Sequence, residues 1–188
     1  MRDAVIVSTA RTGMGKAYKG AFNSTPGATL GAYALKPAIE RAGIDPGEVD
    51  DVLWGAALQQ GAQAGNLGRQ VALRAGCPIG VSGMTLDRQC SSGLMSIATA
   101  AKQIITDRMD VVAAGGQESI SLVQTKEMRV MPDPELVNMH GAVYMPMLQT
   151  AETVAQRYGI SRDQQDEYAL QSQQRTAAAQ EAGKFDDE

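Results

Sequence analysis

The sequence contains few cysteine and aromatic residues, no long apolar run and no excess of positive charge. Of its 188 residues, 2 are cysteine and 4% are aromatic. Two cysteines do not form a disulfide framework, so we expect a reducing, cytoplasmic environment. Lys and Arg number 17 against 21 Asp and Glu, without a basic cluster, which argues against a nucleic-acid-binding surface. The lack of any stretch of about eighteen apolar residues argues against a membrane span.

The length and composition suit one domain or one and a half, because 44% of the residues are hydrophobic and can form a core. The start of the chain lacks the charged, apolar and small-residue order of a signal peptide. Residues 4–10, AVIVSTA, are a β-branched run that predicts a buried first strand.

Strand and helix patterns alternate through the first 120 residues. Further strands are predicted at 49–58, 83–89 and 110–119. Helices are predicted at 28–43, 66–76 and 91–106, the first of them ending at Gly43 and bent at Pro37. This alternation predicts an α/β fold in which helices cover both faces of a mainly parallel sheet.

The pattern changes near residue 120. Residues 121–149 show no period and hold three prolines and five methionines, so we expect a long irregular excursion from the sheet. Two helices are then predicted at 150–159 and 161–183. The second begins with a capping box formed by Ser161 and Gln164, and its polar surface predicts that it faces solvent.

Cys90 stands where the predicted strand 83–89 meets the predicted helix 91–106. Free N–H groups and the positive dipole end at a helix start favour a thiolate, and they can also hold the oxyanion that forms when a thiolate attacks a carbonyl. Small residues follow the cysteine and leave room for an acyl donor. The helix carries a broad apolar face, which predicts that this face is buried.

The junction alone leaves two interpretations of Cys90 open. The first is a reactive thiol, and the second is a small buried hydrophobic residue, which is the usual role of cysteine. Glu118, after the Gly115–Gly116 doublet, has the position of a solvated or capping carboxylate in a turn. Asn66 and Arg69 are polar helix residues that we do not assign to catalysis.

Four separated segments of the sequence carry a resemblance to a known family. They are AVIVSTARTGMGKAYKGAF, GNLGRQVALRAGCP, LDRQCSSGLMSIATAAKQI followed by VVAAGGQESIS, and TAETVAQRYGISRDQQDEYALQSQQRTAAAQEAGKF. Together they resemble the thiolase family, which comprises the acetyl-CoA acetyltransferases and the 3-ketoacyl-CoA thiolases. They agree with the family in order and spacing. The resemblance implies a thiolase-like amino-terminal core domain at 1–120, lacking its late strand, and the first part of an inserted loop domain at 121–188.

The resemblance also implies a chemistry for Cys90. It matches the nucleophile that accepts an acyl group from an acyl-CoA or a 3-ketoacyl-CoA, for Claisen condensation or thiolysis. No metal or tightly held cofactor is implied, because CoA thioesters are the substrates, and the family assembles as homodimers or tetramers. Met147 matches a methionine that lines the thioester pocket, and the segment that holds Glu118 matches one that lies near the active cysteine. The chain departs from the family pattern around Met147, with Pro146 in place of a histidine, and Leu148 and Gln149 in place of glycine and threonine.

The family's mechanism needs a base histidine and a second cysteine, in segments that do not occur in this sequence. The single histidine, His140, lies in the irregular excursion, and we interpret it as a loop residue. Cys77, in AGCPIG, is interpreted as structural. We therefore expect the chain to be an amino-terminal half that is inactive alone. Two alternatives remain, a non-catalytic acyl-CoA-binding or subunit-pairing module, and a cysteine hydrolase using Cys90 with His140.

Overall fold

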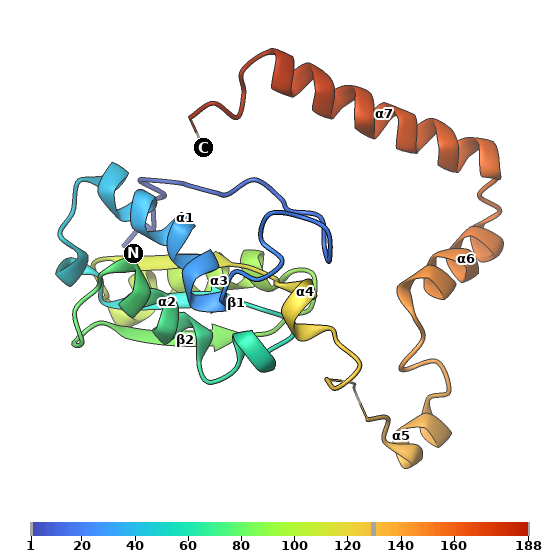
Figure 1. Ribbon diagram of the computed structural model, residues 1–188, viewed down its shortest axis with the longest axis horizontal. Coiled ribbons are helices and arrows are strands. Elements are labelled where there is room, and N and C mark those ends of the chain that lie inside the picture. Colours follow the sequence, from blue (N-terminus) through green and yellow to red (C-terminus); the bar gives the residue numbers. More distant parts are fainter. Residues whose placement is uncertain (1, 129–130, 188) are drawn as a thin grey trace. The chain divides into compact units, whose positions relative to one another are not determined.

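The computed structural model of the chain describes residues 2–128 and 131–187. The chain divides into two units, Met1–Arg129 and Val130–Glu188 (Figure 1). Every strand in the described residues belongs to the first unit. No helix in the described part of the chain is long and apolar enough to cross a membrane.

Three short parallel strands form the sheet of the first unit. These are β1 (Asp51–Gly55), β2 (Ser82–Leu86) and β3 (Val112–Gly116), in the order β2-β1-β3. Asp51 lies opposite both Ser82 and Val112, so the three carboxyl ends meet at one edge. The structure confirms the predicted α/β fold and the last three predicted strands. The central strand β1 is buried along its whole length because strands pair with both of its edges and helices pack on it.

Helices α1 (Gly27–Ala42) and α2 (Leu67–Ala75) pack together over one face of the sheet (Figure 1). As predicted, α1 contains Pro37 and is closed by Gly43 in the left-handed conformation, at φ 69°. Short 3-10 turns at Pro46–Glu48 and Gly61–Gln63 lie in the connecting loops. The main core consists of apolar residues shared by these helices and the sheet, among them Leu35, Ile39, Val52, Trp54, Leu67 and Val71.

Helix α3 (Ser92–Lys102) continues into a π-helical turn, Gln103–Asp107, and packs on β1 and β3. The prediction that its broad apolar face is buried is wrong. The helix buries its small residues Ser92, Ser96 and Ala100, whereas Leu94 is 71% exposed and Ile97 is 43% exposed. The physical reason is close packing, because only small side chains fit where the helix presses against the glycine-containing ends of the strands.

The predicted first strand, 4–10, is also wrong. Its residues form no strand, and Val5, Ile6 and Val7 are 72%, 75% and 74% exposed. The segment runs in the direction of β3, because Arg2 bonds to Asp110 before that strand and the Tyr18 amide bonds to Ser121 after it. Among the described residues no neighbouring strand hydrogen-bonds to the segment, and an extended chain is stable in a sheet only when it is paired.

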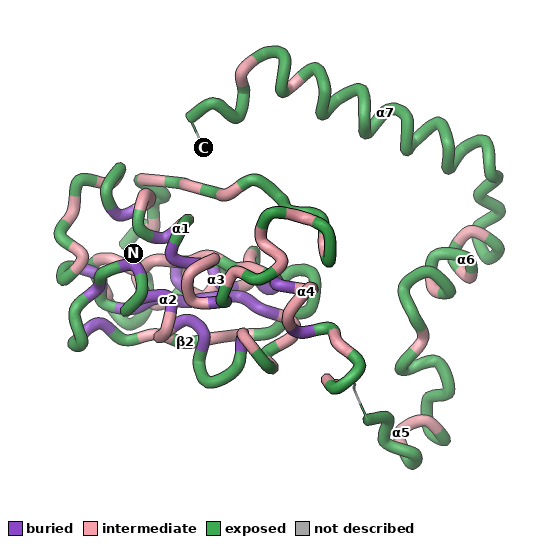
Figure 2. The backbone as a smooth tube through the Cα atoms, in the orientation of Figure 1, coloured by how far each residue is buried: buried purple, intermediate pink, exposed green. Residues whose placement is uncertain are grey.

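The remaining elements among the described residues are helices. Helix α4 (Ile120–Val123) is the last helix of the first unit. The second unit contains α5 (Pro134–Met139), α6 (Met147–Tyr158) and α7 (Arg162–Glu181). The two predicted late helices are thus confirmed, as is the Ser161–Gln164 capping box. No residue in the described range 131–187 is buried, as Figure 2 shows, so this unit has no core of its own.

Candidate active site

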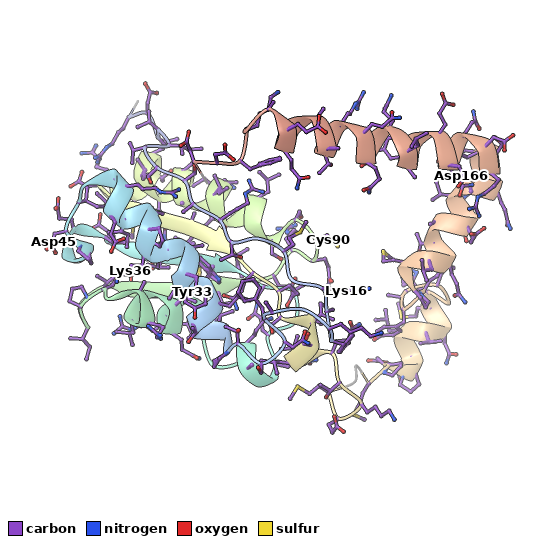
Figure 3. The ribbon with its side chains drawn as sticks, turned by 45° about the horizontal axis from the view of Figure 1, so that its top comes forward. Lys16, Tyr33, Lys36, Asp45, Cys90 and Asp166 are labelled. Carbon is purple, nitrogen blue, oxygen red and sulfur yellow. The ribbon has the colours of Figure 1, made fainter. Side chains whose placement is uncertain are left out.

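Cys90 lies in the short loop that joins β2 to α3, at the edge where the carboxyl ends of the parallel strands meet. Its side chain is exposed at the surface of the first unit (Figure 3). The next residue, Ser91, is the N-cap of α3. In open α/β sheets this edge is the usual place for a ligand. The cysteine therefore lies neither within a strand nor within a helix, and its sulfur is open to solvent.

The loop that carries Cys90 is a tight turn held by its own polar side chains. Gln89 adopts a positive φ of 49°, which is uncommon for a residue other than glycine. The Asp87 carboxylate accepts from the Gln89 amide at 2.6 Å. The Ser92 hydroxyl accepts from the Arg88 amide at 2.9 Å and donates to the Gln89 carbonyl oxygen at 2.6 Å. These bonds compensate for the unfavourable backbone conformation and keep Cys90 in one place.

Unpaired amides stand at the start of α3. Within residues 2–128 the N–H groups of Gly93 and Leu94 have no hydrogen-bond acceptor, and the side chain of Ser91 does not cap them. Such groups carry the positive end of the helix dipole. A negative charge nearby, whether on a thiolate or on an oxyanion, is stabilised by them.

The start of α3 packs directly against the ends of the strands. A Cβ placed on Gly55 would fall 2.5 Å from the Ser92 carbonyl carbon, and one placed on Gly116 would fall 3.2 Å from the Gly93 Cα. The hydroxyl of Ser96, which is fully buried, lies 2.7 Å from the carbonyl oxygens of both Gly93 and Gly115. The glycines at the strand ends thus allow the backbone contact that fixes the helix relative to β1 and β3.

Glu118 ties the loop after β3 to the loop after β1. Its carboxylate accepts from the amides of Ala57 at 2.8 Å and Leu58 at 3.4 Å, so the capping interpretation of Glu118 agrees with its contacts. Gln63, which is fully buried, donates to Glu118 and accepts from the Ser119 amide at 2.7 Å. Sequence reasoning missed Gln63, because a single glutamine in a polar loop carries no local signal of burial.

Asn66 and Arg69 have structural contacts, which agrees with the prediction that gave them no catalytic role. The Asn66 side chain caps α2 by accepting from the Arg69 amide, and it donates to the Gly83 carbonyl oxygen at 2.8 Å. The Arg69 guanidinium donates to the carbonyl oxygens of Ile79 and Val81. Both residues connect α2 with the segment that leads into β2.

Cys77 differs from Cys90 in its surroundings. It is 4% exposed and belongs to the main core, as expected for a structural cysteine. Burial raises the pKa of the Cys77 thiol, and the positive charge of Arg69 offsets part of this increase. Cys77 is therefore held as a neutral thiol, which is a poor nucleophile.

The remaining predicted residues lie in the second unit. Met147 is the first residue of α6, and its side chain is 70% exposed. His140 caps the end of α5 and donates its amide to the Leu136 carbonyl oxygen at 2.8 Å. No group of three or more His, Cys, Asp or Glu residues in the described segments could hold a metal ion.

Comparison with known proteins gives consistent matches along the whole chain. The family model described as "Thiolase, N-terminal domain" matches residues 4–188. The 3-ketoacyl-CoA thiolase of Bacillus subtilis (strain 168) is 43% identical over 188 residues, which is 100% of this chain and 48% of that protein. The acetyl-CoA acetyltransferase of Cupriavidus necator is 41% identical, over 100% of this chain and 50% of that protein.

A solved structure gives the same result. The crystal structure of the Bacillus anthracis acetyl-CoA acetyltransferase superposes with a TM-score of 0.84 at 34% identity, covering 100% of this chain and 50% of that one. The chain thus spans about half the length of the curated relatives it matches.

Proposed function

The chain belongs to the thiolase family, and from this premise we propose that it supplies the nucleophilic half of a thiolase-type acyltransferase. Cys90 is the proposed nucleophile, acyl-CoA and 3-ketoacyl-CoA thioesters are the proposed substrates, and no metal or tightly held cofactor takes part. The observation that carries the proposal is the position of Cys90, exposed one residue before the N-cap of a helix in which the amides of Gly93 and Leu94 have no acceptor within residues 2–128.

The proposed step is acyl transfer to sulfur. The Cys90 thiolate attacks the thioester carbonyl carbon, the new S–C bond forms, and the carbonyl oxygen becomes an oxyanion. Collapse of this intermediate breaks the bond to the CoA sulfur, which leaves with its electron pair as a thiolate. The amide of Cys90 is a proposed donor to the oxyanion. The acyl group then passes to a second thioester in condensation, or to free CoA in thiolysis.

We further propose that this chain is incomplete as an enzyme. The exposed apolar face of α3 and the unpaired segment 4–10 both support this, because large exposed apolar surfaces mark places where another element packs. The core assigned to 1–120 would then receive its late strand, its base histidine and its second cysteine from outside the chain. The assembled enzyme is proposed to be a homodimer or tetramer, with Met147 lining the thioester pocket.

Release of CoA tests this function. Mixing the chain with acetyl-CoA should release about one equivalent of CoA per chain and then stop, since acylation proceeds and turnover does not. The Cys90→Ser variant should release none. No release by the unmodified chain would contradict a Cys90 nucleophile that is activated by the start of α3 alone, and continued release would contradict the proposal that the chain is incomplete as an enzyme. A chain that binds acetyl-CoA without releasing CoA would instead be the non-catalytic binding module.

A further inference from the structure

Two donors of Ser92 converge on the carbonyl oxygen of Gln89. The Ser92 hydroxyl lies 2.6 Å from that oxygen, and the Ser92 amide lies 3.0 Å from it. Ser92 is 5% exposed, and its hydroxyl also accepts from the Arg88 amide, so its single proton is committed to the Gln89 carbonyl oxygen. The direction of the Gln89 carbonyl is therefore set by a buried side chain and not by solvent.

The same peptide unit contains the amide of Cys90. A trans peptide is planar, and its C=O and N–H bonds point in opposite directions. Because the Gln89 carbonyl is drawn towards Ser92 at the buried start of α3, the Cys90 N–H points away from that contact. Within residues 2–128 this N–H has no acceptor. It is thus a free donor on the residue that carries the sulfur.

Resting on the proposed nucleophile, we propose that Ser92 is a positioning residue that aims the Cys90 N–H at the carbonyl oxygen of the bound acyl group. Ser92 touches neither the substrate nor the sulfur in this account. Its hydroxyl fixes the plane of the Gln89–Cys90 peptide, and that plane directs the donor to the developing oxyanion. A donor fixed before reaction stabilises the transition state without reorganising.

Two neighbouring serines provide matched controls. Ser91 is exposed, and its hydroxyl donates to the Arg88 carbonyl oxygen at 2.9 Å, which belongs to a different peptide unit. Ser96 is as buried as Ser92, but its hydroxyl contacts only the carbonyl oxygens of Gly93 and Gly115. Ser91→Ala thus tests the loss of a nearby hydroxyl, and Ser96→Ala tests the loss of a buried one.

The experiment compares two reactions of the same thiolate. p-Nitrophenyl acetate transfers its acetyl group to Cys90 through an oxyanion, breaking the ester C–O bond and releasing p-nitrophenolate. Iodoacetamide alkylates the same sulfur by displacing iodide, and no oxyanion forms. A change in the thiolate fraction affects both rates and cancels in their ratio. The ratio of acylation to alkylation therefore measures how well the Cys90 N–H stabilises the oxyanion. Each rate is measured on the full chain after subtracting that of Cys90→Ser.

Ser92→Ala should lower the ratio of acylation to alkylation by roughly 10- to 100-fold, because an oxyanion donor is misdirected. Ser92→Thr, which keeps the hydroxyl, should restore most of the ratio, and the Ser91 and Ser96 variants should leave it unchanged. Asp87→Ala removes a surface carboxylate that accepts from the Gln89 amide, so it loosens the same turn and should lower the ratio to a smaller extent. This variant replaces Ser92→Ala in the test if Ser92→Ala does not fold.

Two results would overturn the inference. One is a ratio that stays within about twofold of the unmodified chain in both Ser92→Ala and Asp87→Ala, since loss of a single oxyanion donor is worth far more. The other is an equal loss in Ser96→Ala, which would show that any buried hydroxyl serves. An unmodified chain that is alkylated but never acylated would instead refute the proposed function, so the two failures are distinguishable.

Discussion

Gly55 at the end of β1 lies against the backbone of Ser92, so closely that a Cβ on Gly55 would fall 2.5 Å from the Ser92 carbonyl carbon. The strand end therefore sets the position of the helix start, and through it the position of Cys90. No flexible side chain lies between the two backbones to absorb a change.

Gly55→Ala should destabilise the fold by about 1–3 kcal/mol, because the new methyl group forces two backbones apart. The matched control is Gly93→Ala, since a Cβ at Gly93 has no atom within 4 Å. Urea unfolding of both variants measures the effect. Equal stability of the two variants would show that the contact between β1 and α3 is looser than described.

The exposed apolar face of α3 predicts the behaviour of the isolated chain. A double variant, Leu94→Gln with Ile97→Gln, should reduce the binding of a hydrophobic dye and reduce self-association, because both side chains face solvent. Its free energy of unfolding should change by less than about 0.5 kcal/mol for each substitution.

Leu53→Gln is the buried counterpart, because Leu53 is 0% exposed in β1. This substitution should destabilise the chain strongly. Similar losses of stability in the Leu94–Ile97 double variant and in Leu53→Gln would contradict an exposed face on α3.

Cys77 predicts a dependence of stability on pH. Burial raises its folded pKa above the unfolded value, so the neutral thiol contributes stability that is fully present below about pH 8.5 and is lost as the pH rises through the folded value. The free energy of unfolding should thus fall in alkaline buffer, and Cys77→Ala should fall less steeply. Urea unfolding across this pH range gives both slopes, and parallel slopes would rule out the contribution of Cys77.

The capping box of α7 predicts a local effect in the second unit. The Ser161 side chain accepts from the Gln164 amide, and the Gln164 side chain accepts from the Ser161 amide at 2.9 Å. Ser161→Ala should cost about 1 kcal/mol of helix stability. Faster amide hydrogen exchange in the first turns of α7 would show this loss. Ser172→Ala, in the middle of the same helix, should slow exchange, because alanine is the better helix former.

The sequence predicted the elements whose signals are local. The Gly43 cap, the helix after Asn66 and the capping box at Ser161 depend on neighbouring residues, and all three are present. The parallel sheet followed from the alternation of strand and helix patterns. The position of Cys90 at a strand-to-helix junction followed in the same way.

The predictions that were wrong or incomplete concern contacts between distant segments. The β-branched run at 4–10 has the composition of a strand, but pairing depends on a neighbour that composition does not reveal. The apolar spacing of α3 predicts that its apolar face is buried. The opposite face packs on the sheet instead, because Ser92 and Ser96 fit against Gly55 and Gly115. The hydrogen bond between buried Gln63 and Glu118 joins loops that are 55 residues apart in the sequence.

The identity of the residue that receives the acyl group tests the central claim most directly. The unmodified chain is treated with acetyl-CoA, digested with a protease and analysed by mass spectrometry. The peptide containing Cys90 should gain the mass of one acetyl group, and the peptide containing Cys77 should gain none. An acetyl group found on another residue, with the Cys90 peptide unchanged, would contradict that claim.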